Sequence, residues 1–157
     1  MRLEYLQTGA ISSTLSPGDA EKVRGLVEKG ALALEQGDAS TMLDLYTDDA
    51  IAHAPGLPST QPTRQSKQQF YAWLMNASNG MNFILQDLQV DDKRVIVKYQ
   101  TEFTLQGGSV HKGDFILTAD TVKVGDGYKF SSSRLSGDLS ALLPLWVKSS
   151  GPIPAQW

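Results

Sequence analysis

The spacing of hydrophobic and polar positions changes near residue 80 of this chain. Before that point apolar residues recur at every third or fourth position, and after it they alternate with polar residues. The first spacing is typical of helices with one buried side, and the second is typical of strands with one buried face. Helices followed by consecutive strands predict an α+β domain.

A first helix is predicted from Ser16-Pro17 to residue 36. Serine can cap a helix, and proline is tolerated at the first helical position because the amide it lacks would have no partner there. Apolar residues follow at helical spacing until Gly37 ends the helix. Gly30 lies on the apolar stripe, where it leaves room either for a closely packed neighbour or for a ligand.

The stretch from Gly37 to Pro55 carries the main candidate chemistry. Asp38 can cap a short helix, and Tyr46 lies on the buried side of this helix as part of a pocket wall. A strand of small and apolar residues follows and carries His53, whose imidazole can remove or return a proton. Taken alone, a histidine in such an apolar run is more often a satisfied structural residue than a catalyst.

A proline-rich loop over residues 55–65 precedes a further helix, predicted over residues 66–77. Ser66 and Gln69 have the spacing of a capping box. Phe70 and Trp73 fall on the buried side of this helix. An aromatic residue at helical spacing is usually part of the core, but Trp73 can also contribute to the wall of a pocket.

Four strands are predicted over residues 83–90, 94–106, 110–124 and 128–136, joined by tight turns into an antiparallel meander. In the second of them Tyr99 shares a face with Val95 and Val97. In the third, one face carries Asp114, Ile116, Thr118, Asp120 and Val122, and the opposite face carries Phe115, Leu117 and Ala119.

Length and composition limit the possible classes of protein. A chain of 157 residues with 41% hydrophobic residues predicts one globular domain. We divide it into an N-terminal arm (1–15), a core (16–137) and an apolar C-terminal extension (138–157). The net charge of −3 argues against a nucleic-acid partner, and no apolar run approaches the length that crosses a bilayer. The N-terminal residues do not resemble a secretory signal, so we expect a cytoplasmic protein.

The residue types also limit the possible reaction chemistry. The chain has no cysteine, which excludes disulfides, thiolate metal sites and cysteine nucleophiles. Its two histidines, His53 and His111, are far apart and lack the spacing of metal ligands, so no metal site is predicted. No glycine-rich loop precedes a helix, so no nucleotide cofactor is predicted either.

Several short segments, taken in order, resemble the SnoaL-like branch of the nuclear transport factor 2-like superfamily across residues 17–136. The resemblance implies a curved antiparallel sheet, wrapped by about three N-terminal helices into a cone with an internal apolar pocket. It also implies a homodimer formed through the outer face of the sheet. The segments are Ala33–Asp38, Leu45–Ala50, His53-x-Pro55, Arg94-Val95-x-Val97 and Asp126–Phe130.

The catalytic pattern of the related enzymes is incomplete in this chain. In the ketosteroid isomerases, the resemblance places the general base at Ala54, the oxyanion-binding tyrosine at Gly30 and a late acid at Asp120. Only the late acid is present, so steroid-type isomerase activity is not expected. The SnoaL-like cyclases share the histidine strand, but their last-strand aspartate is replaced in the stretch Phe130–Leu135.

The remaining polar residues still permit acid–base chemistry. A carboxyl group at Asp120 that faces an apolar cavity would resist ionisation and could serve as a neutral acid, while His53 moves a proton. Tyr99 can donate to a developing oxyanion. Arg134 is either an anchor for a substrate oxygen or a counter-ion for Asp120, and a buried ion pair without a catalytic role is an equal alternative. The expected substrate-binding residues are Tyr46, Trp73, Gly30, Asp114 and Thr118.

Two functions from different classes follow. The first is a cofactor-independent cyclase, isomerase or dehydratase that acts on a small apolar polyketide- or terpenoid-like intermediate. The alternative is a non-catalytic domain of the same fold that binds a small ligand or another protein. The enzyme requires that His53, Tyr99 and Asp120 converge on one cavity, and a position of His53 on the outer face of the sheet would contradict an acid–base role.

The third strand and the C-terminal extension carry two further expectations. Phe115, Leu117 and Ala119 are expected on the outer face of the sheet, where they would form the homodimer seam. The prolines of the extension predict a helical turn over residues 139–143 followed by an extended segment that covers the pocket mouth. Deletion of residues 145–157 is then expected to impair turnover more than folding.

Overall fold

The computed structural model describes residues 12–13, 15–105 and 107–157. The expected N-terminal arm lies mostly outside these residues. Its described part is not wholly loose, because β1 (Ser12–Ser13) pairs in parallel with Gln89 and Val90.

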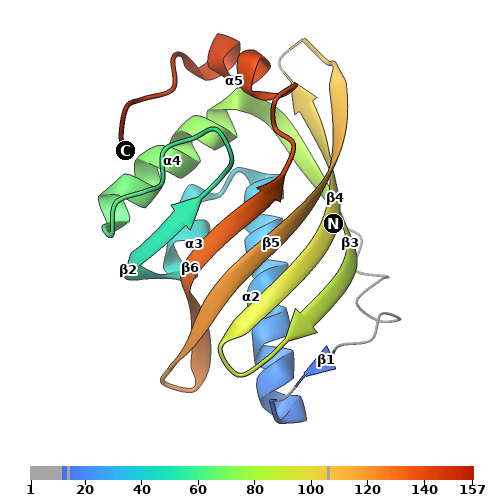
Figure 1. The fold of residues 1–157 in the computed structure, drawn as a ribbon, viewed down its shortest axis with the longest axis vertical. Helices are drawn as coiled ribbons and strands as arrows, with labels where there is room; N and C mark the ends of the chain where they lie inside the picture. The colour runs from blue at the N-terminus through green and yellow to red at the C-terminus, as the bar shows by residue number, and fades with distance from the viewer. Residues whose placement is uncertain (1–11, 14, 106) are drawn as a thin grey trace.

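The described strands form one mixed six-stranded sheet in the order β1-β3-β4-β5-β6-β2 (Figure 1). The predicted antiparallel meander is confirmed as β3 (Ser78–Val90), β4 (Arg94–Leu105), β5 (Val110–Val124) and β6 (Gly127–Gly137). The two edge strands, β1 and β2 (Tyr46–His53), each pair in parallel with a neighbour. A parallel pair needs a crossover connection, and the helices between β1 and β3 in the chain provide one for that pair.

The first two helices begin and end where their caps predict. The hydroxyl of Ser16 accepts from the amide of Asp19 at 3.2 Å, and α2 (Pro17–Gln36) ends at Gly37, whose φ of 67° is left-handed. The carboxylate of Asp38 accepts from the amide of Thr41 at 3.0 Å and caps α3 (Ala39–Asp44). Local capping chemistry therefore fixes this part of the fold.

The other two helices differ from their predicted bounds. The helix α4 (Arg64–Ala77) begins two residues before Ser66, because the hydroxyl of Thr63 accepts from the amide of Ser66 at 3.1 Å. The predicted turn over residues 139–143 is confirmed, because the carbonyl oxygen of Leu139 accepts from the amides of Leu142 (3.0 Å) and Leu143 (2.9 Å). The extended segment predicted directly after it is wrong, since α5 (Leu143–Ser150) follows the turn. Pro144 lies in the first turn of α5, where proline is tolerated, so it starts a helix rather than preventing one.

Helices cover one face of the sheet and leave the other open. In Figure 1, α2 passes behind the meander, and α4 and α5 lie side by side at one end, near the C-terminus.

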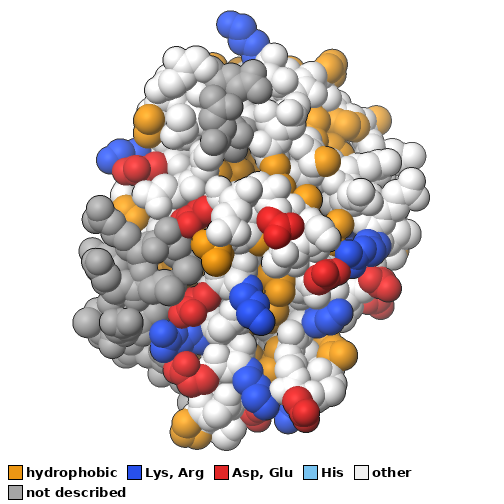
Figure 2. Space-filling model, turned by 180° about the vertical axis from the view of Figure 1, so that it is seen from behind, with side chains coloured by type: hydrophobic (Ala, Val, Ile, Leu, Met, Phe, Trp, Pro, Cys, Tyr) orange, Lys and Arg blue, Asp and Glu red, His pale blue; other side chains and the backbone are white. Residues whose placement is uncertain are grey.

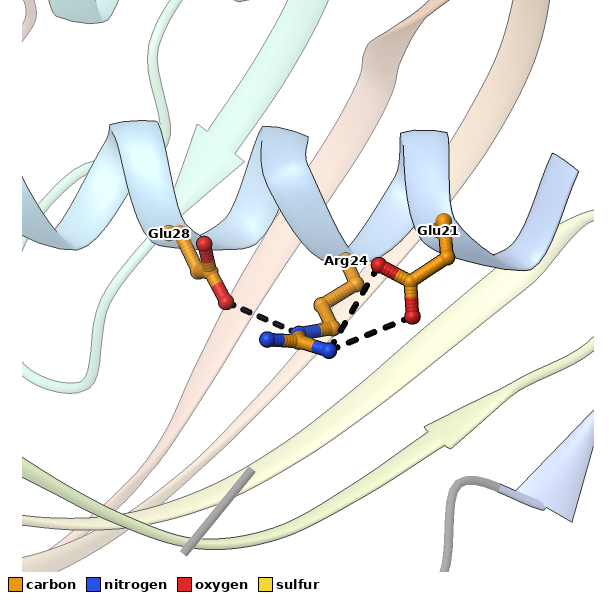
Figure 3. A network of polar contacts seen from close by, with 3 residues as sticks. All are labelled: Glu21, Arg24 and Glu28. Carbon is orange, nitrogen blue, oxygen red and sulfur yellow. Dashed lines mark hydrogen bonds and ion pairs between the residues drawn. The ribbon is translucent and has the colours of Figure 1, made fainter. Parts of the chain in front are cut away.

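Acidic and basic side chains are interspersed on the face seen from behind (Figure 2). On α2, the guanidinium of Arg24 bridges Glu21 at 3.2 Å and Glu28 at 2.9 Å (Figure 3). Among the described residues, no helix is both long enough and apolar enough to span a membrane.

The residues expected on the inner face of the sheet are confirmed in β4, whereas in β5 alternation grouped the residues correctly and the inner face was assigned to the wrong group. Val95 and Val97 are buried, as expected. Their partners in β5 are Ala119 and Leu117, which therefore also point inward. The predicted positions of these two residues and of Phe115, on the outer face, are wrong, because paired residues of neighbouring strands share a face.

A buried lysine joins α4 to β2. The side chain of Lys67 is fully buried, and its ammonium group donates to the carbonyl oxygens of Asp48 (2.6 Å), Ala50 (3.0 Å) and Thr63 (3.1 Å). Burial lowers the pKa of Lys67, whereas the nearby carboxylates of Asp48 and Asp49 act in the opposite direction. The contacts fall where β2 and β6 lose register between Tyr46 and Ile51, so Lys67 satisfies carbonyls at this irregularity.

Candidate functional site

An apolar cavity of about 100 Å³ lies between the inner face of the sheet and the helices. A smaller cavity of about 50 Å³ adjoins it and shares Tyr46, Tyr99 and Leu117 among its lining residues. The larger cavity is lined by Leu34, Met42, Tyr46, Ala52, His53, Ala54, Leu57, Phe70, Tyr71, Leu74, Met81, Phe83, Tyr99, Phe103, Leu117, Ser133, Leu135, Leu139 and Trp146.

Three hydroxyl groups form a chain at this cavity. The hydroxyl of Tyr71 on α4 donates to the hydroxyl of Tyr46 on β2 at 2.9 Å. The hydroxyl of Tyr46 in turn donates to Ser133 Oγ on β6 at 2.7 Å. The ring of Tyr46 also packs on Phe130, with ring centroids 5.4 Å apart. The polar side of the cavity is therefore assembled from three elements that are distant in the sequence.

The tyrosines at the cavity are neutral hydrogen-bond donors. Burial raises the pKa of Tyr46, and the bonds to Ser133 and Tyr71 oppose that rise only partly. Burial likewise raises the pKa of Tyr71 well above its ordinary value, and it raises the pKa of Tyr99. Tyr99 lines both cavities, and among the described residues its hydroxyl has no hydrogen-bond partner. That hydroxyl is available to a bound molecule.

A register shift turns Ser133 inward. Strict alternation from buried Phe130 would point Arg134 into the core. Between Phe130 and Ser132, however, β6 advances two residues while β5 advances one, so Ser131 is an extra residue in the strand. Ser133 is consequently buried and Arg134 is exposed. Alternation alone does not reveal this bulge, which explains why Ser133 was not among the predicted site residues.

His53 lies at the rim of the cavity. It ends β2, between buried Ala52 and Ala54, and is itself half-buried. Its Nδ1 atom is 2.8 Å from the hydroxyl of Ser59 in the following loop. Its register partner is the exposed Arg134, so the imidazole is directed toward the outer edge rather than the cavity centre. His53 therefore reaches the cavity only at its rim, and its acid–base role stays a prediction.

Asp120 lies on the outer face of the sheet. Its carboxylate accepts from Arg94 Nε at 2.9 Å and from the hydroxyl of Ser132 at 3.1 Å. The prediction that Asp120 shares a cavity with His53 and Tyr99 is wrong, because its strand neighbour Ala119 is the residue that points inward. The predicted pairing of Asp120 with Arg134 is also wrong, since Arg94 is the ion-pair partner.

The expected substrate-binding residues divide between the two faces. Asp114 is exposed and accepts from Gln100 at 3.3 Å, while Thr118 lies on the same outer face beside Arg134. These two positions are therefore corrected to the outside. Tyr46 lines the cavity as expected.

The other two expected binding residues lie at the cavity margins. Gly30 borders the smaller cavity, where an added Cβ would lie 3.6 Å from Leu45, an ordinary contact distance, so close packing does not require a glycine there. Trp73 packs edge-on against Trp146 and contacts Trp157, and it lies behind the cavity wall rather than in it.

The C-terminal extension forms part of the cavity wall. Leu139 and Trp146 line the cavity, and both are almost fully buried. The indole N–H of Trp157 donates to the carbonyl oxygen of Pro58 at 2.7 Å, and its ring packs edge-on against Phe70. The extension thus joins the core as well as the cavity, and loss of residues 145–157 would remove buried aromatic side chains. Deletion is now expected to impair folding as well as turnover.

The cavity offers donors rather than charges. None of the described lining residues is an aspartate, glutamate, lysine or arginine. Among the described residues, no group of three or more His, Cys, Asp or Glu side chains is placed to hold a metal ion. Phenol and serine hydroxyls in a dry cavity bind and polarise an oxygen atom of a bound molecule.

Residues 23–132 match the SnoaL-like domain family. No curated protein sequence matches the chain. A ketosteroid isomerase-like protein from Erwinia carotovora atroseptica is 17% identical, with 78% of this chain and 98% of that one covered and a TM-score of 0.64. A candidate dehydratase of the NTF2-like family from Streptomyces avermitilis is 20% identical, with 80% and 100% covered and a TM-score of 0.68.

A third similar structure is a hexachlorocyclohexane dehydrochlorinase from Novosphingobium barchaimii LL02. It is 12% identical, with 75% of this chain and 85% of that one covered and a TM-score of 0.64. At such low identities the three likenesses show a common fold, a cone formed by a curved sheet and its helices.

Proposed function

This chain belongs to the SnoaL-like domain family, and from that premise we propose that it is a cofactor-independent enzyme. It isomerises, cyclises or dehydrates a small, uncharged, apolar molecule of polyketide or terpenoid type in the cavity. The observation that carries this proposal is the set of four hydroxyls, from Tyr46, Tyr71, Tyr99 and Ser133, in an otherwise apolar enclosure. Tyr46, Tyr71 and Ser133 are bonded to one another, whereas the Tyr99 hydroxyl has no partner among the described residues, and a substrate oxygen would provide one.

The proposed chemistry divides between the cavity and its rim. Neutral hydroxyl donors stabilise negative charge that develops on a substrate oxygen, most strongly where water is excluded. His53 removes or returns the proton at the rim, because its Nδ1 is held by Ser59 and its Nε2 is left for proton transfer. The names of the similar structures, which include an isomerase-like protein and a candidate dehydratase, support this class of reaction.

Proton transfer can be tested without knowledge of the natural substrate. We expect the protein to accelerate exchange of hydrogen for deuterium next to the carbonyl of cyclohex-2-enone in D₂O, followed by NMR. His53→Gln is expected to slow this exchange by about 100-fold or more, with the ketone still bound. His111→Gln, at the other histidine and outside the cavity lining, is the matched control and should retain full exchange. Exchange no faster than in buffer would contradict the enzyme.

One observation favours a second candidate function, a non-catalytic ligand-binding domain. The cavity holds no carboxylate among its described lining residues, and the imidazole of His53 is directed toward the outer edge. In that case the wild-type protein binds the ketone without accelerating exchange, and His53→Gln changes only the affinity. The same experiment therefore separates the two candidates.

A further inference from the structure

The loop between β2 and α4 is held in place on both sides of Ser59. On one side, the amide of Thr60 donates to the carbonyl oxygen of Ala52 at 3.0 Å, and the hydroxyl of Thr60 accepts from the amide of Ala52 at 2.9 Å. On the other side, the carbonyl oxygen of Pro58 accepts from the indole N–H of Trp157 at 2.7 Å. Ser59 therefore lies between a residue bonded to β2 and a residue bonded to the C-terminal extension.

Trp157 is in turn packed against α4. Its side chain is almost fully buried, and its ring centroid lies 5.5 Å from that of Phe70 and 5.8 Å from that of Trp73. In Figure 1 the C-terminus accordingly lies beside α4 and close to the loop that follows β2. Packing fixes the ring of Trp157, and the hydrogen bond from its N–H fixes the loop carbonyl that it meets.

A second part of the extension contacts the same loop. A Cβ atom added at Gly56 would lie only 2.5 Å from Cδ1 of Leu143, so the loop lies directly against the start of α5. Leu57, the next residue of the loop, is buried and lines the cavity. The loop is therefore held between β2 and the extension, at the edge of the candidate site.

The bond between Ser59 and His53 depends on the position of this loop. The hydroxyl of Ser59 is 2.8 Å from Nδ1 of His53. Ser59 is exposed and His53 is half-buried, so water competes for both groups and the bond persists only if the two side chains are held together. A neutral imidazole has one N–H and one acceptor nitrogen, and a bond at one nitrogen decides which of them carries the hydrogen. A hydrogen on Nδ1 leaves Nε2 as the acceptor, which is the form that a base needs.

We propose that Trp157 is a positioning residue for His53. Because it holds the carbonyl group of Pro58, it keeps Ser59 as the acceptor of the hydrogen on Nδ1, and Nε2 of the imidazole stays ready to remove a proton. This inference rests on the proposed function and adds to it a residue from outside the matched family domain, which ends at residue 132. Trp157 needs no contact with the substrate in this role, and it is not among the residues that line the cavity.

Nitrogen NMR of the imidazole tests the arrangement without any substrate. The chain has two histidines, so labelling with ¹⁵N-histidine gives two imidazole spectra, and His111→Gln identifies the one from His53. At about pH 8, above the ordinary pKa of histidine, the wild type is expected to carry the hydrogen of His53 mainly on Nδ1. A hydrogen mainly on Nε2 in the wild type would overturn the inference before any further variant is made.

Trp157→Phe keeps an aromatic ring against α4 and removes the N–H group. The share of His53 with its hydrogen on Nδ1 is expected to fall toward that of a free histidine side chain, as it should in Ser59→Ala. Ser150→Ala is the matched control, because the hydroxyl of Ser150 in α5 also donates to a carbonyl oxygen at 2.8 Å, but to that of Trp73 in α4. This control should leave His53 unchanged, and the melting temperature of each variant confirms folding.

Deuterium exchange of cyclohex-2-enone tests the consequence for catalysis. Trp157→Phe is expected to slow the catalysed exchange about tenfold, because a small displacement of the base lowers the rate. The affinity for the ketone, measured by calorimetric titration, should change by less than about twofold. Ser150→Ala should retain wild-type exchange. Equal losses of exchange and affinity in Trp157→Phe would show that the cavity itself has changed, and would overturn the positioning role.

The outcomes separate this inference from the proposed function. A changed His53 tautomer in Trp157→Phe, without catalysed exchange in the wild type, would support the positioning role and contradict the enzyme. Catalysed exchange with the tautomer and the rate both unchanged in Trp157→Phe would support the enzyme and overturn the positioning role. The same change of tautomer in Ser150→Ala would indicate a general loosening of the extension, and would also overturn the role assigned to Trp157.

Discussion

The two faces of the sheet carry similar chemical groups under opposite conditions. On the outer face, Asp120 and Arg94 form an ion pair with side chains that are 44% and 53% exposed. On the inner face, uncharged hydroxyls of Tyr46 and Ser133 are bonded in a buried enclosure. An exposed ion pair contributes little because water screens it, whereas a hydrogen bond in a dry site has a much larger effect. The charged residues of the sheet are therefore not the residues that form the candidate site.

The largest effect should distinguish the two faces within one strand. Phe115→Ala is expected to lower the free energy of unfolding by about 3–5 kcal/mol, because the ring is buried against Tyr99 and Phe103. Ile116→Ala, one residue on and 37% exposed, should cost less than about 1 kcal/mol. Urea denaturation measures both values.

The homodimer through the outer sheet face stays a prediction, and the same pair of variants sharpens it. Comparable losses in Phe115→Ala and Ile116→Ala would indicate that the outer face is covered in solution. Sedimentation should then give the mass of two chains, and that mass should fall in Ile116→Lys. A mass of one chain at micromolar concentration would contradict the dimer.

Removal of the Lys67 ammonium group should have the next largest effect. Lys67→Met keeps the length of the side chain but leaves the carbonyl groups of Asp48 and Ala50 without the ammonium donor, at a cost of about 3 kcal/mol. The carbonyl group of Thr63 still accepts from the backbone amide of residue 67. Lys98→Met, at an exposed position on the outer face, should cost less than about 0.5 kcal/mol. Both changes are read by urea denaturation, and equal stabilities would show that the Lys67 contacts contribute nothing.

Alkaline pH should lower the free energy of unfolding through Tyr99, a residue of the inner face. Burial holds the pKa of Tyr99 above its unfolded value of about 10, so the folded state keeps a proton that the unfolded state loses. The stabilisation is complete below about pH 10 and decreases as the pH rises. Near pH 11, Tyr99 alone should account for a loss of about 1.4 kcal/mol. Urea denaturation at pH 8 and 11 should show a smaller loss in Tyr99→Phe than in the wild type, and equal losses would contradict the role of its ionisation.

The smallest effect is expected at the acid that the family resemblance suggested. Asp120→Asn removes one charge of an exposed ion pair and should change stability by less than about 1 kcal/mol. Ketone binding and deuterium exchange should both stay at wild-type levels, because Asp120 does not line the cavity. A loss of exchange of tenfold or more in this variant would require Asp120 to reach the substrate.

Local patterns predicted the first three helices and the antiparallel meander because their determinants lie close together in the sequence. The caps at Ser16 and Asp38 and the turn at Gly37 were all readable from neighbouring residues. The faces of β5 were also readable, since Phe115 and Leu117 lie on the side without charges. The resemblance to ketosteroid isomerases pointed to Asp120 instead, and for the direction of a side chain the alternation was the better guide.

The polar side of the cavity was not readable, for a physical reason. Ser133 points inward only because Ser131 is an extra residue in β6, and nothing in the run Ser131–Ser133 marks which serine that is. Tyr71 lies beside the predicted stripe of α4 and meets Tyr46 through tertiary packing. Sites that depend on a register shift and on contacts between distant elements require the folded structure.

The enclosed ammonium group of Lys67 makes this lysine a reporter of local opening. Reagents that acylate amines need access to a free, neutral nitrogen, and three carbonyl groups surround this one. Acylation at Lys67 should therefore proceed only when α4 separates from β2, whereas exposed Lys98 reacts at once. Mass spectrometry of the labelled chain then gives the rate of acylation at Lys67. This rate reports how often α4, the helix beside the cavity, separates from β2, with no probe introduced into the protein.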